Sequence, residues 1–335
     1  MTNKKAFLGA IKYIFFFGAG IGIFVWVYRN QNIGSLYSGL SEFQYGWIIA
    51  SLGIGLLSHF FRALRWRMLI ESIGYKPGVL NTFLSILVMY LANYALPRMG
   101  EVTRCGILKK YEEIPFTSQL GTVMIERIVD FLFLLLILTS VIMIEFDVLA
   151  STLKHNENGI ESNNFTFLIS PWFISLAVIL FLLLILSWLL RNRLRQTRLV
   201  QKFRSYLVKF TKGLKSVFHL RNPLLFTILT ISIYGCYYLQ TWFVMIAFAP
   251  TALLSPIVAL VVLAFGTVGM VLPVQGGIGT FHALAVYALM LYGVSENDGT
   301  ILALALHGST AVFLIFIGAA ALAILPIVNN KKIIF

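Results

Sequence analysis

The chain has little charge and, within that charge, few acidic residues. Only 12% of its 335 residues are charged, 59% are hydrophobic, and the mean hydropathy is +0.87. Because an ordinary soluble domain has about 25% charged residues, this composition excludes a soluble enzyme. Lys and Arg number 26 against 13 Asp and Glu, which gives a net charge of +13. In so apolar a chain this surplus indicates the anionic cytoplasmic face of a membrane rather than nucleic acid.

Cysteine is also scarce, and no metal-ligand spacing is present. Cys105 and Cys236 form neither a C-x-x-C pair nor a disulfide framework. No combination of His, Cys and carboxylate has the spacing of a metal site. We therefore expect no metal and no cofactor.

What the chain has in abundance is long apolar stretches, each near the roughly 20 residues that a helix needs to cross a bilayer. Eight such spans are predicted: Tyr13–Val27, Trp47–Leu69, Val79–Leu96, Leu120–Ile144, Phe173–Leu190, Leu224–Phe248, Ile257–Leu272 and Ile301–Ile327. Two further helices, Gly100–Lys110 and Ile278–Tyr292, are too short or too polar to cross alone. The predicted fold class is an all-α polytopic membrane protein.

The distribution of Lys and Arg predicts the orientation. Residues 191–221 contain ten basic residues and no acidic one, so this segment is expected in the cytoplasm. Its apolar residues recur at helical spacing, which is typical of an amphipathic helix on an anionic leaflet. The loop 145–161 has four acidic residues against Lys154 and is expected outside. Lysine pairs near both ends predict that both termini lie in the cytoplasm. The expected location is the plasma (inner) membrane, which the chain crosses several times.

These sides impose a count of crossings. The chain is expected in the cytoplasm at Arg62–Lys76 and again at Lys110, so residues 79–110 must enter and leave on that side. By the same count, residues 257–292 must enter and leave on the outer side. The prediction is therefore six full spans and two re-entrant hairpins that enter from opposite faces.

The two hairpins break at similar sequences, L-P-R-M-G-E at 96–101 and L-P-V-Q-G-G at 272–277. Helix breaks at matching places in two oppositely oriented halves indicate a transporter site at the midplane. The alternative is two prolines that kink their helices, with glycines for packing. We predict one transmembrane domain over 1–335, an inverted repeat with halves of about 1–145 and 222–330 and a linker of about 191–221.

Ionisable side chains inside the first half are costly in a membrane and need a partner or a function. On the second span Arg62 lies deep, whereas Arg65 either snorkels to the surface or shares the cationic face. Arg98, Glu101 and Arg104 follow Pro97 at the start of a short helix, whose N-terminus and arginines favour an anion. A purely structural Glu101–Arg104 pair is the alternative.

The fourth span adds Glu126, Arg127 and Asp130 in its first turns. Glu126 and Asp130 share a helix face, and Arg127 is spaced to pair with Asp130. The trio either neutralises Arg62 or Arg104 or takes part in proton coupling, and the spacing does not separate these roles.

The second hairpin offers amides instead of charges. Gln275, Gly276, Gly277 and Gly279 precede a helix that carries His282 in its first turn. A glycine run at a helix start exposes N–H groups to an oxyanion. We expect His307, on the last span, to serve packing.

The chain resembles the family of the lysylphosphatidylglycerol synthetase transmembrane region, flippase-like UPF0104-type membrane proteins. The resemblance rests on R-A-L-R-W-R at 62–67, N-Y-A-L-P-R-M-G-E-V-T-R at 93–104, E-R-I-V-D at 126–130 and G-G-I-G-T-F-H-A at 276–283. It implies movement of an anionic or aminoacylated lipid between leaflets and adds Asn93 to the expected substrate-binding residues. Many relatives have Glu where His282 stands. In better-known members a catalytic domain follows, and because this chain ends at Phe335 we expect no synthetase activity.

The predicted function is a lipid flippase or transporter, not an enzyme, whose partner is an anionic lipid. The expected substrate-binding residues are Arg62, Asn93, Arg98, Arg104, Gln275, Gly276, Gly277 and Gly279. The expected charge-balancing or proton-coupling residues are Glu101, Glu126, Arg127, Asp130 and His282. Two alternatives stay open: an accessory subunit for a membrane glycosyl- or acyltransferase, and an intramembrane enzyme. A homodimer is a further possible assembly, and no nucleic-acid partner is expected.

Overall fold

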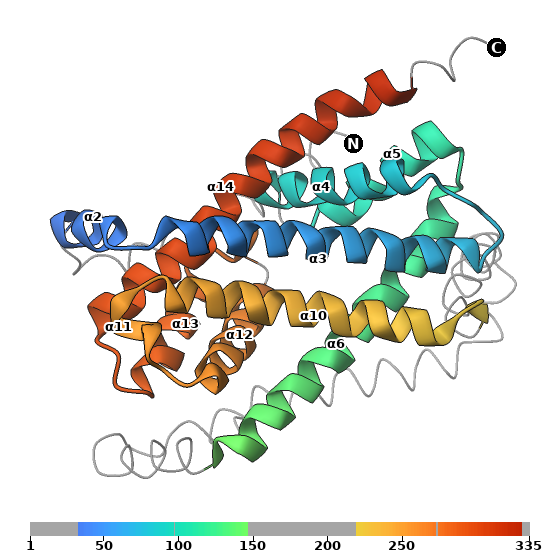
Figure 1. Cartoon of the computed structure of the whole chain (residues 1–335). Helices are drawn as coiled ribbons and strands as arrows, with labels where there is room; N and C mark the ends of the chain where they lie inside the picture. The colour runs from blue at the N-terminus through green and yellow to red at the C-terminus, as the bar shows by residue number, and fades with distance from the viewer. Residues whose placement is uncertain (1–32, 97, 147–218, 273, 330–335) are drawn as a thin grey trace, which may run out of the picture.

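The computed structural model describes residues 33–96, 98–146, 219–272 and 274–329 (Figure 1). In these residues all regular structure is helical, which confirms the all-α class. The α-helices are α2 (Ile33–Ser41), α3 (Tyr45–Glu71), α4 (Val79–Ala95), α5 (Gly100–Glu112), α6 (Phe116–Ile144), α10 (Pro223–Ile246), α11 (Ala249–Ala252), α12 (Pro256–Val271), α13 (Thr280–Met290) and α14 (Glu296–Asn329), and η2 (Gln275–Gly277) is a short 3-10 helix. The predicted spans Tyr13–Val27 and Phe173–Leu190 and nearly all of the basic linker lie outside the described residues.

Four of the described helices are long and apolar enough to cross a membrane: α3, α6, α10 and α14, with 27, 29, 24 and 34 residues. The two apolar helices α4 and α12 have only 17 and 16 residues. Their shortness fits the prediction that each is one arm of a hairpin. The observed α6 and α14 begin four and five residues before the predicted spans, because a polar first turn continues each helix beyond its apolar run.

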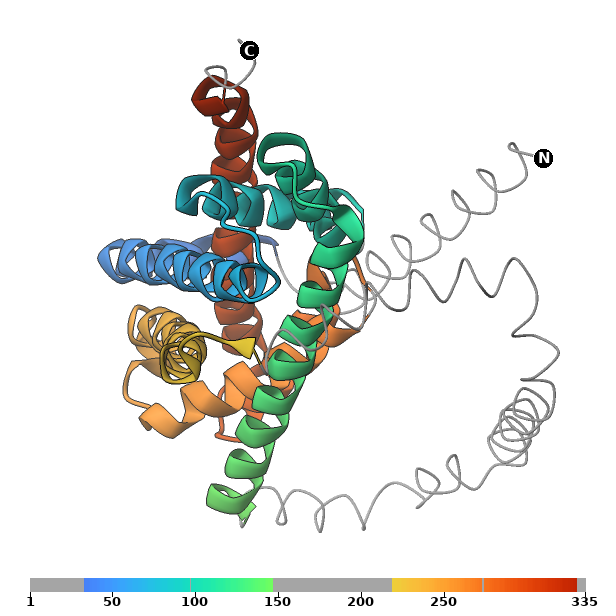
Figure 2. The same ribbon diagram turned by 90° about the vertical axis from the view of Figure 1, so that its right-hand side faces the viewer.

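The helices α3 and α10 pack against each other in opposite directions (Figure 1). At one end the amide of Gln44, before α3, donates to the carbonyl of Ala247, after α10, at 2.9 Å. Towards the other end Arg65 Nη1 donates to Thr230 Oγ1 at 3.4 Å. In Figure 2, α3 and α10 point towards the viewer, while α14 (red) runs nearly vertically and α6 (green) is tilted beside it. Because α3 and α10 are antiparallel, each of two opposite ends of the molecule contains the start of one of these helices and the end of the other.

The first hairpin consists of α4, residues 96–99 and α5, and it opens at the end where α3 stops. There the Glu112 carboxylate, at the end of α5, accepts hydrogen bonds from Gly78 N at 3.2 Å and from the Asn81 side chain. α4 ends at Ala95, and Leu96 is extended with φ −143° and ψ 128°. A residue before proline is driven out of the helical region, which accounts for the break at this position.

The second hairpin consists of α12, residues 272–279 and α13, and it opens at the opposite end, where α10 stops (Figure 1). Its arms are in close contact: Thr280 Oγ1 donates to the carbonyl of Gly269 at 2.8 Å. A side chain at Gly269 would bring its Cβ within 2.7 Å of the Thr280 carbonyl oxygen. The opposed hairpins that the sequence predicts are therefore present in the described residues.

The two halves repeat the same order of helices at a nearly constant spacing. α5 and α13 begin 180 residues apart (280 − 100), as do α6 and α14 (296 − 116), and α4 and α12 end 176 residues apart (271 − 95). The difference of four lies in the breaks, 96–99 and 272–279. Within the described part of the chain, α3–α4–α5–α6 thus corresponds to α10–α12–α13–α14, and corresponding helices run in opposite directions.

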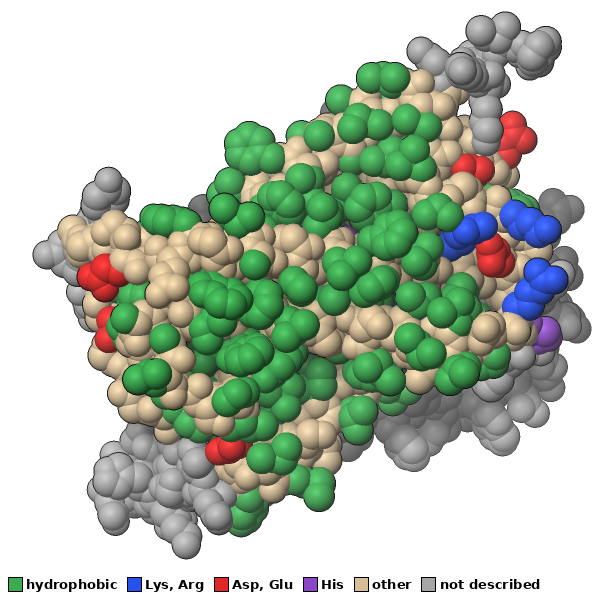
Figure 3. Space-filling model, in the orientation of Figure 1, with side chains coloured by type: hydrophobic (Ala, Val, Ile, Leu, Met, Phe, Trp, Pro, Cys, Tyr) green, Lys and Arg blue, Asp and Glu red, His purple; other side chains and the backbone are tan. Residues whose placement is uncertain are grey.

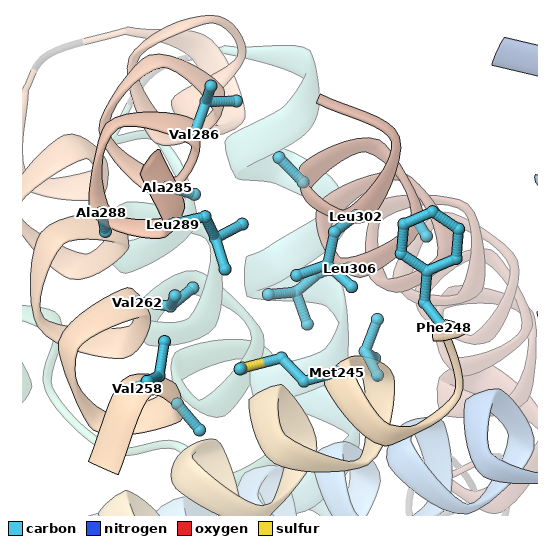
Figure 4. Packing of buried hydrophobic residues seen from close by; sticks show 14 of the residues in the cluster. Met245, Phe248, Val258, Val262, Ala285, Val286, Ala288, Leu289, Leu302 and Leu306 are labelled. Carbon is cyan, nitrogen blue, oxygen red and sulfur yellow. The ribbon is translucent and has the colours of Figure 1, made fainter. Parts of the chain in front are cut away.

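The largest apolar core lies mostly in the second half, although Phe43 and Val141 of the first half also belong to it. In the second half Met245, Leu289, Leu302 and Leu306 converge from three helices (Figure 4). In the first half a separate core is built around Trp66. The face of the molecule shown in Figure 3 is also largely apolar, as expected where helices face lipid. Polar side chains in the interior of the protein are therefore the ones that indicate where a functional site lies.

Candidate functional site

Seven ionisable side chains from three helices of the first half meet in what we call the ion-pair cluster. α3 provides Arg62 and Arg65, α5 provides Glu101 and Arg104, and α6 provides Glu126, Arg127 and Asp130. The sequence predicted six of the seven as site residues. The structure brings these six together although they lie on three separate helices, α3, α5 and α6.

Glu126 is at the centre of the cluster, and its side chain is completely buried. One carboxylate oxygen accepts a hydrogen bond from Arg104 Nη1 at 2.8 Å. The other lies 3.4 Å from Arg62, 3.5 Å from Arg65 and 3.6 Å from Arg127. One carboxylate therefore faces four guanidinium groups.

Asp130, one turn further along α6, extends the network. Its carboxylate lies 2.6 Å from Arg65 Nη2 and 3.3 Å from Arg62 Nη2. Arg127 lies 3.9 Å from Asp130 and 3.9 Å from Glu101. The Arg127 side chain is 39% exposed, so the Arg127–Glu101 edge is where the cluster reaches the molecular surface.

The cluster has an uncompensated positive charge. Its four arginines and three carboxylates leave a balance of +1. Within the described structure Arg104 Nε and Nη2 and the Nε atoms of Arg62 and Arg65 are buried without a hydrogen-bond acceptor. Unsatisfied donors on a buried cation are costly, and an oxyanion would be a suitable acceptor for them.

Aromatic and hydroxyl side chains hold the arginines in position. The Arg104 guanidinium lies 4.4 Å from the Trp66 ring centroid, and Trp66 Nε1 donates to Thr122 Oγ1 at 3.0 Å. A cation over an indole face is stabilised by about 0.5–2 kcal/mol. This packing fixes Arg104 against α3 while its Nε and Nη2 remain unused.

Arg65 is the member that the sequence did not assign to the site. Its side chain is fully buried, so it does not snorkel to the surface. The sequence did place it about 60° round α3 from Arg62. That angle is small enough for both residues to reach the same face of α6. It is the feature of the sequence from which Arg65 could have been assigned to the site.

The other predicted site residues gather at the point where the two hairpins meet, which we call the tip contact. Arg98 Nη2 donates to the carbonyl of Val271, the last residue of α12, at 3.3 Å. The Gln275 side chain donates to the carbonyls of Tyr94 and Ala95, at the end of α4, the latter at 2.8 Å. Each hairpin thus provides a donor for the end of the other hairpin's first helix.

The glycine run of the second break is folded on itself. Gly277 N donates to Val274 O at 3.3 Å, and Gly279 N donates to His282 Nδ1 at 3.3 Å. These amides are engaged within the hairpin, so the oxyanion cradle expected there stays a prediction. The His282 ring lies 4.9 Å from that of His307.

Asn93 has a local role in the first break. Its Oδ1 accepts a hydrogen bond from Gly100 N, the first amide of α5, at 2.8 Å. This bond connects the end of α4 to the start of α5 across the proline. Asn93 therefore shapes the tip of the first hairpin.

Opposed hairpins between long apolar helices, with a charged cluster buried beside them, define an all-α polytopic membrane protein. Within that class the chain belongs to the family of the lysylphosphatidylglycerol synthase transmembrane region, which matches residues 10–318. This confirms the family resemblance seen in the sequence.

The chain is also similar to a curated membrane protein. The chain is 27% identical over 186 residues to a UPF0104 membrane protein of Methanocaldococcus jannaschii. The matched region covers 54% of this chain and 52% of that protein, so it spans about half the length of the relative. No solved structure matches the chain.

Proposed function

We propose that the protein moves a lipid with an anionic phosphate-bearing head group between the two leaflets of the membrane. The observation that carries the proposal is the buried ion-pair cluster with its +1 balance. A phosphodiester has one negative charge and several acceptor oxygens, so it would neutralise this surplus and accept from the unused arginine N–H groups. Membership of a membrane family named for a lipid-related synthase is consistent with a lipid substrate.

The paired hairpins support a transport role for this site. Their tips meet between helices that run in opposite directions, the arrangement that places substrate sites of transporters at the repeat interface. On the face in Figure 3, Lys and Arg side chains gather at the end where the first hairpin opens. We propose that this end faces the cytoplasm, with both termini on the same side, in the plasma membrane.

Arg127 gives the sharpest test, because it supplies charge to the cluster from a partly exposed position. Arg127→Gln brings the balance from +1 to 0 and leaves the buried pairs of Glu126 with Arg104 and Arg62 in place. Arg67→Gln is the matched control, since Arg67 is 33% exposed and pairs at 3.0 Å with Glu71 outside the cluster.

The measurement is the flux of fluorescent lipids across liposomes that contain the purified protein. We expect Arg127→Gln to slow an anionic phospholipid about tenfold, which corresponds to about 1.4 kcal/mol of lost stabilisation, and Arg67→Gln to have no effect. A phosphate-free glycolipid should be moved slowly by all three proteins. Equal anionic flux in parent and Arg127→Gln would reject the cluster as the substrate site.

The same liposomes test the proposal that the protein is a transporter without enzymatic activity. Lipids recovered after flux should have unchanged masses. A new lipid species would favour the intramembrane enzyme instead. Absence of flux, together with a co-purified membrane transferase, would favour the accessory-subunit alternative.

A further inference from the structure

The tip contact satisfies backbone groups that the breaks leave open. Where a helix stops at membrane depth, its last carbonyls have no partner within the helix, and no bulk water is present to bind them. Here Gln275 serves Tyr94 and Ala95 at the end of α4, while Arg98 serves Val271 at the end of α12. Separating the tips would therefore leave carbonyls of both hairpins without these donors.

The contact is also close. A Cβ atom on Gly276 would lie 2.7 Å from two ring carbons of Tyr94, so the backbone of the second tip rests on the Tyr94 ring. Gly276 has φ +58°, a conformation that glycine adopts without strain. The tips therefore interlock through side chains, ring and backbone together.

The two sides of this interlock differ in strength. Gln275 is half-buried and donates to two carbonyls. Arg98 is exposed, its guanidinium donates to the Val271 carbonyl at 3.3 Å, and its backbone has φ +60°. A left-handed conformation costs a non-glycine residue about 1–2 kcal/mol. Arg98 is thus a charged group that is strained and weakly held.

A phosphate oxyanion is a stronger partner for a guanidinium than a neutral carbonyl, because it adds opposite charge and can accept two parallel N–H···O bonds from the guanidinium. A phosphate group that reaches the tips would accept from the Arg98 guanidinium in place of Val271. The exchange would release α12 from the first hairpin and leave Gln275 as the remaining connection.

We propose that the Arg98–Val271 contact is a latch between the two hairpins that a phosphate-bearing head group opens. The latch rests on the proposed function, and it adds that substrate recognition and separation of the halves are one event. Arg98 is in this view the residue that couples binding to opening, while the ion-pair cluster supplies the charge balance.

The test measures the distance between the tips with spin labels. Leu96→Cys and Leu272→Cys place one label on each tip at positions that are 38% and 47% exposed. Cys105→Ala and Cys236→Ala remove the two native thiols, both of which are buried. The labelled protein is examined in discs of uncharged glycolipid, alone, with added phosphatidylglycerol, or with inorganic phosphate.

The latch predicts one short distance in glycolipid alone and an additional longer distance with phosphatidylglycerol. A longer distance with inorganic phosphate as well would show that phosphate suffices, and its absence there would show that the whole lipid is needed. Arg98→Gly removes the guanidinium and leaves the backbone unstrained, so its tips should show the longer distance in all three samples. Arg67→Gln is the control and should behave like the parent.

An unchanged short distance in every sample of the parent would overturn the latch. If anionic flux still depended on Arg127, the proposed function would stand without it. If no flux were found while phosphatidylglycerol separated the tips, the latch would stand as a lipid-responsive contact and the transport proposal would fail.

Discussion

The two halves of the molecule share a scaffold and differ in what fills it. At the spacing of 180 residues, Glu126 corresponds to Leu306 and Arg127 to His307, and both pairs lie on the corresponding helices α6 and α14. Glu126 is in contact with four arginines, whereas Leu306 belongs to the apolar core in Figure 4.

A second correspondence lies at the edge of the cluster. Arg127 and Glu101 form an ion pair at 3.9 Å. Their counterparts His307 and Phe281 form a ring contact with centroids 4.9 Å apart. The same pair of positions is in contact in both halves, while the chemistry of the contact changes from ionic to aromatic. The comparison teaches that the repeat supplies architecture and that one half supplies the charge.

The largest expected effect is at the centre of the charged half. Glu126→Gln keeps the shape of the side chain but leaves four arginines, three of them buried, with one carboxylate fewer. Removing one partner of a buried ion pair costs about 3–5 kcal/mol, and thermal unfolding in detergent measures the loss. Glu71→Gln, at a 37% exposed side chain in a surface pair, should cost less than about 1 kcal/mol. Equal losses would refute the cluster as a buried network.

A smaller effect is expected at the equivalent place in the neutral half. Leu306→Ala removes packing from a buried apolar site and should cost about 3 kcal/mol. Because no charge is lost there, the preference for anionic over uncharged lipid should stay at the parent value. Leu253→Ala is the control, since Leu253 is 99% exposed. A changed lipid preference in Leu306→Ala would break the division between the halves.

The smallest of the three effects concerns the longer break of the second half. Gly276→Ala should cost about 2 kcal/mol, from backbone strain and from contact with the Tyr94 ring. Gly293→Ala isolates the strain, because Gly293 has φ +78° and open space around it. Combining Gly276→Ala with Tyr94→Ala should cost less than the sum of the single changes. A strictly additive double variant would show that the tips do not touch.

The sequence was sufficient to predict the opposed hairpins and the described helices other than the short α2 and α11. Apolar length, the count of basic residues and proline positions act locally, so they identified α3, α10 and both breaks. The membership of Glu126 and Arg104 in one site also followed from the cost of charge in a membrane.

The partners at the tips could not be predicted in the same way. Nothing in the sequence around Gln275 indicates that its amide serves Tyr94, which lies 181 residues away. Such a contact depends on how two hairpins dock, and many polar side chains could satisfy the same carbonyls. For Arg65 the sequence did not separate snorkelling to the surface from sharing the cationic face with Arg62. Burial near a helix end is decided by the neighbouring helices and not by spacing.

The ion-pair cluster also has a consequence for how the chain is assembled. Arg65 and Asp130 are 65 residues apart, and α3 leaves the ribosome before α6. Until α6 follows, the arginines of α3 have no carboxylate partner in the cluster and lie in the half of α3 nearer its C-terminal end, within reach of the membrane surface. Arrival of Glu126 and Asp130 then gives these arginines their counter-ions. Pairing of the cluster therefore requires α6 but none of the second half, and a chain that stops before α6 would leave the arginines of α3 without these counter-ions.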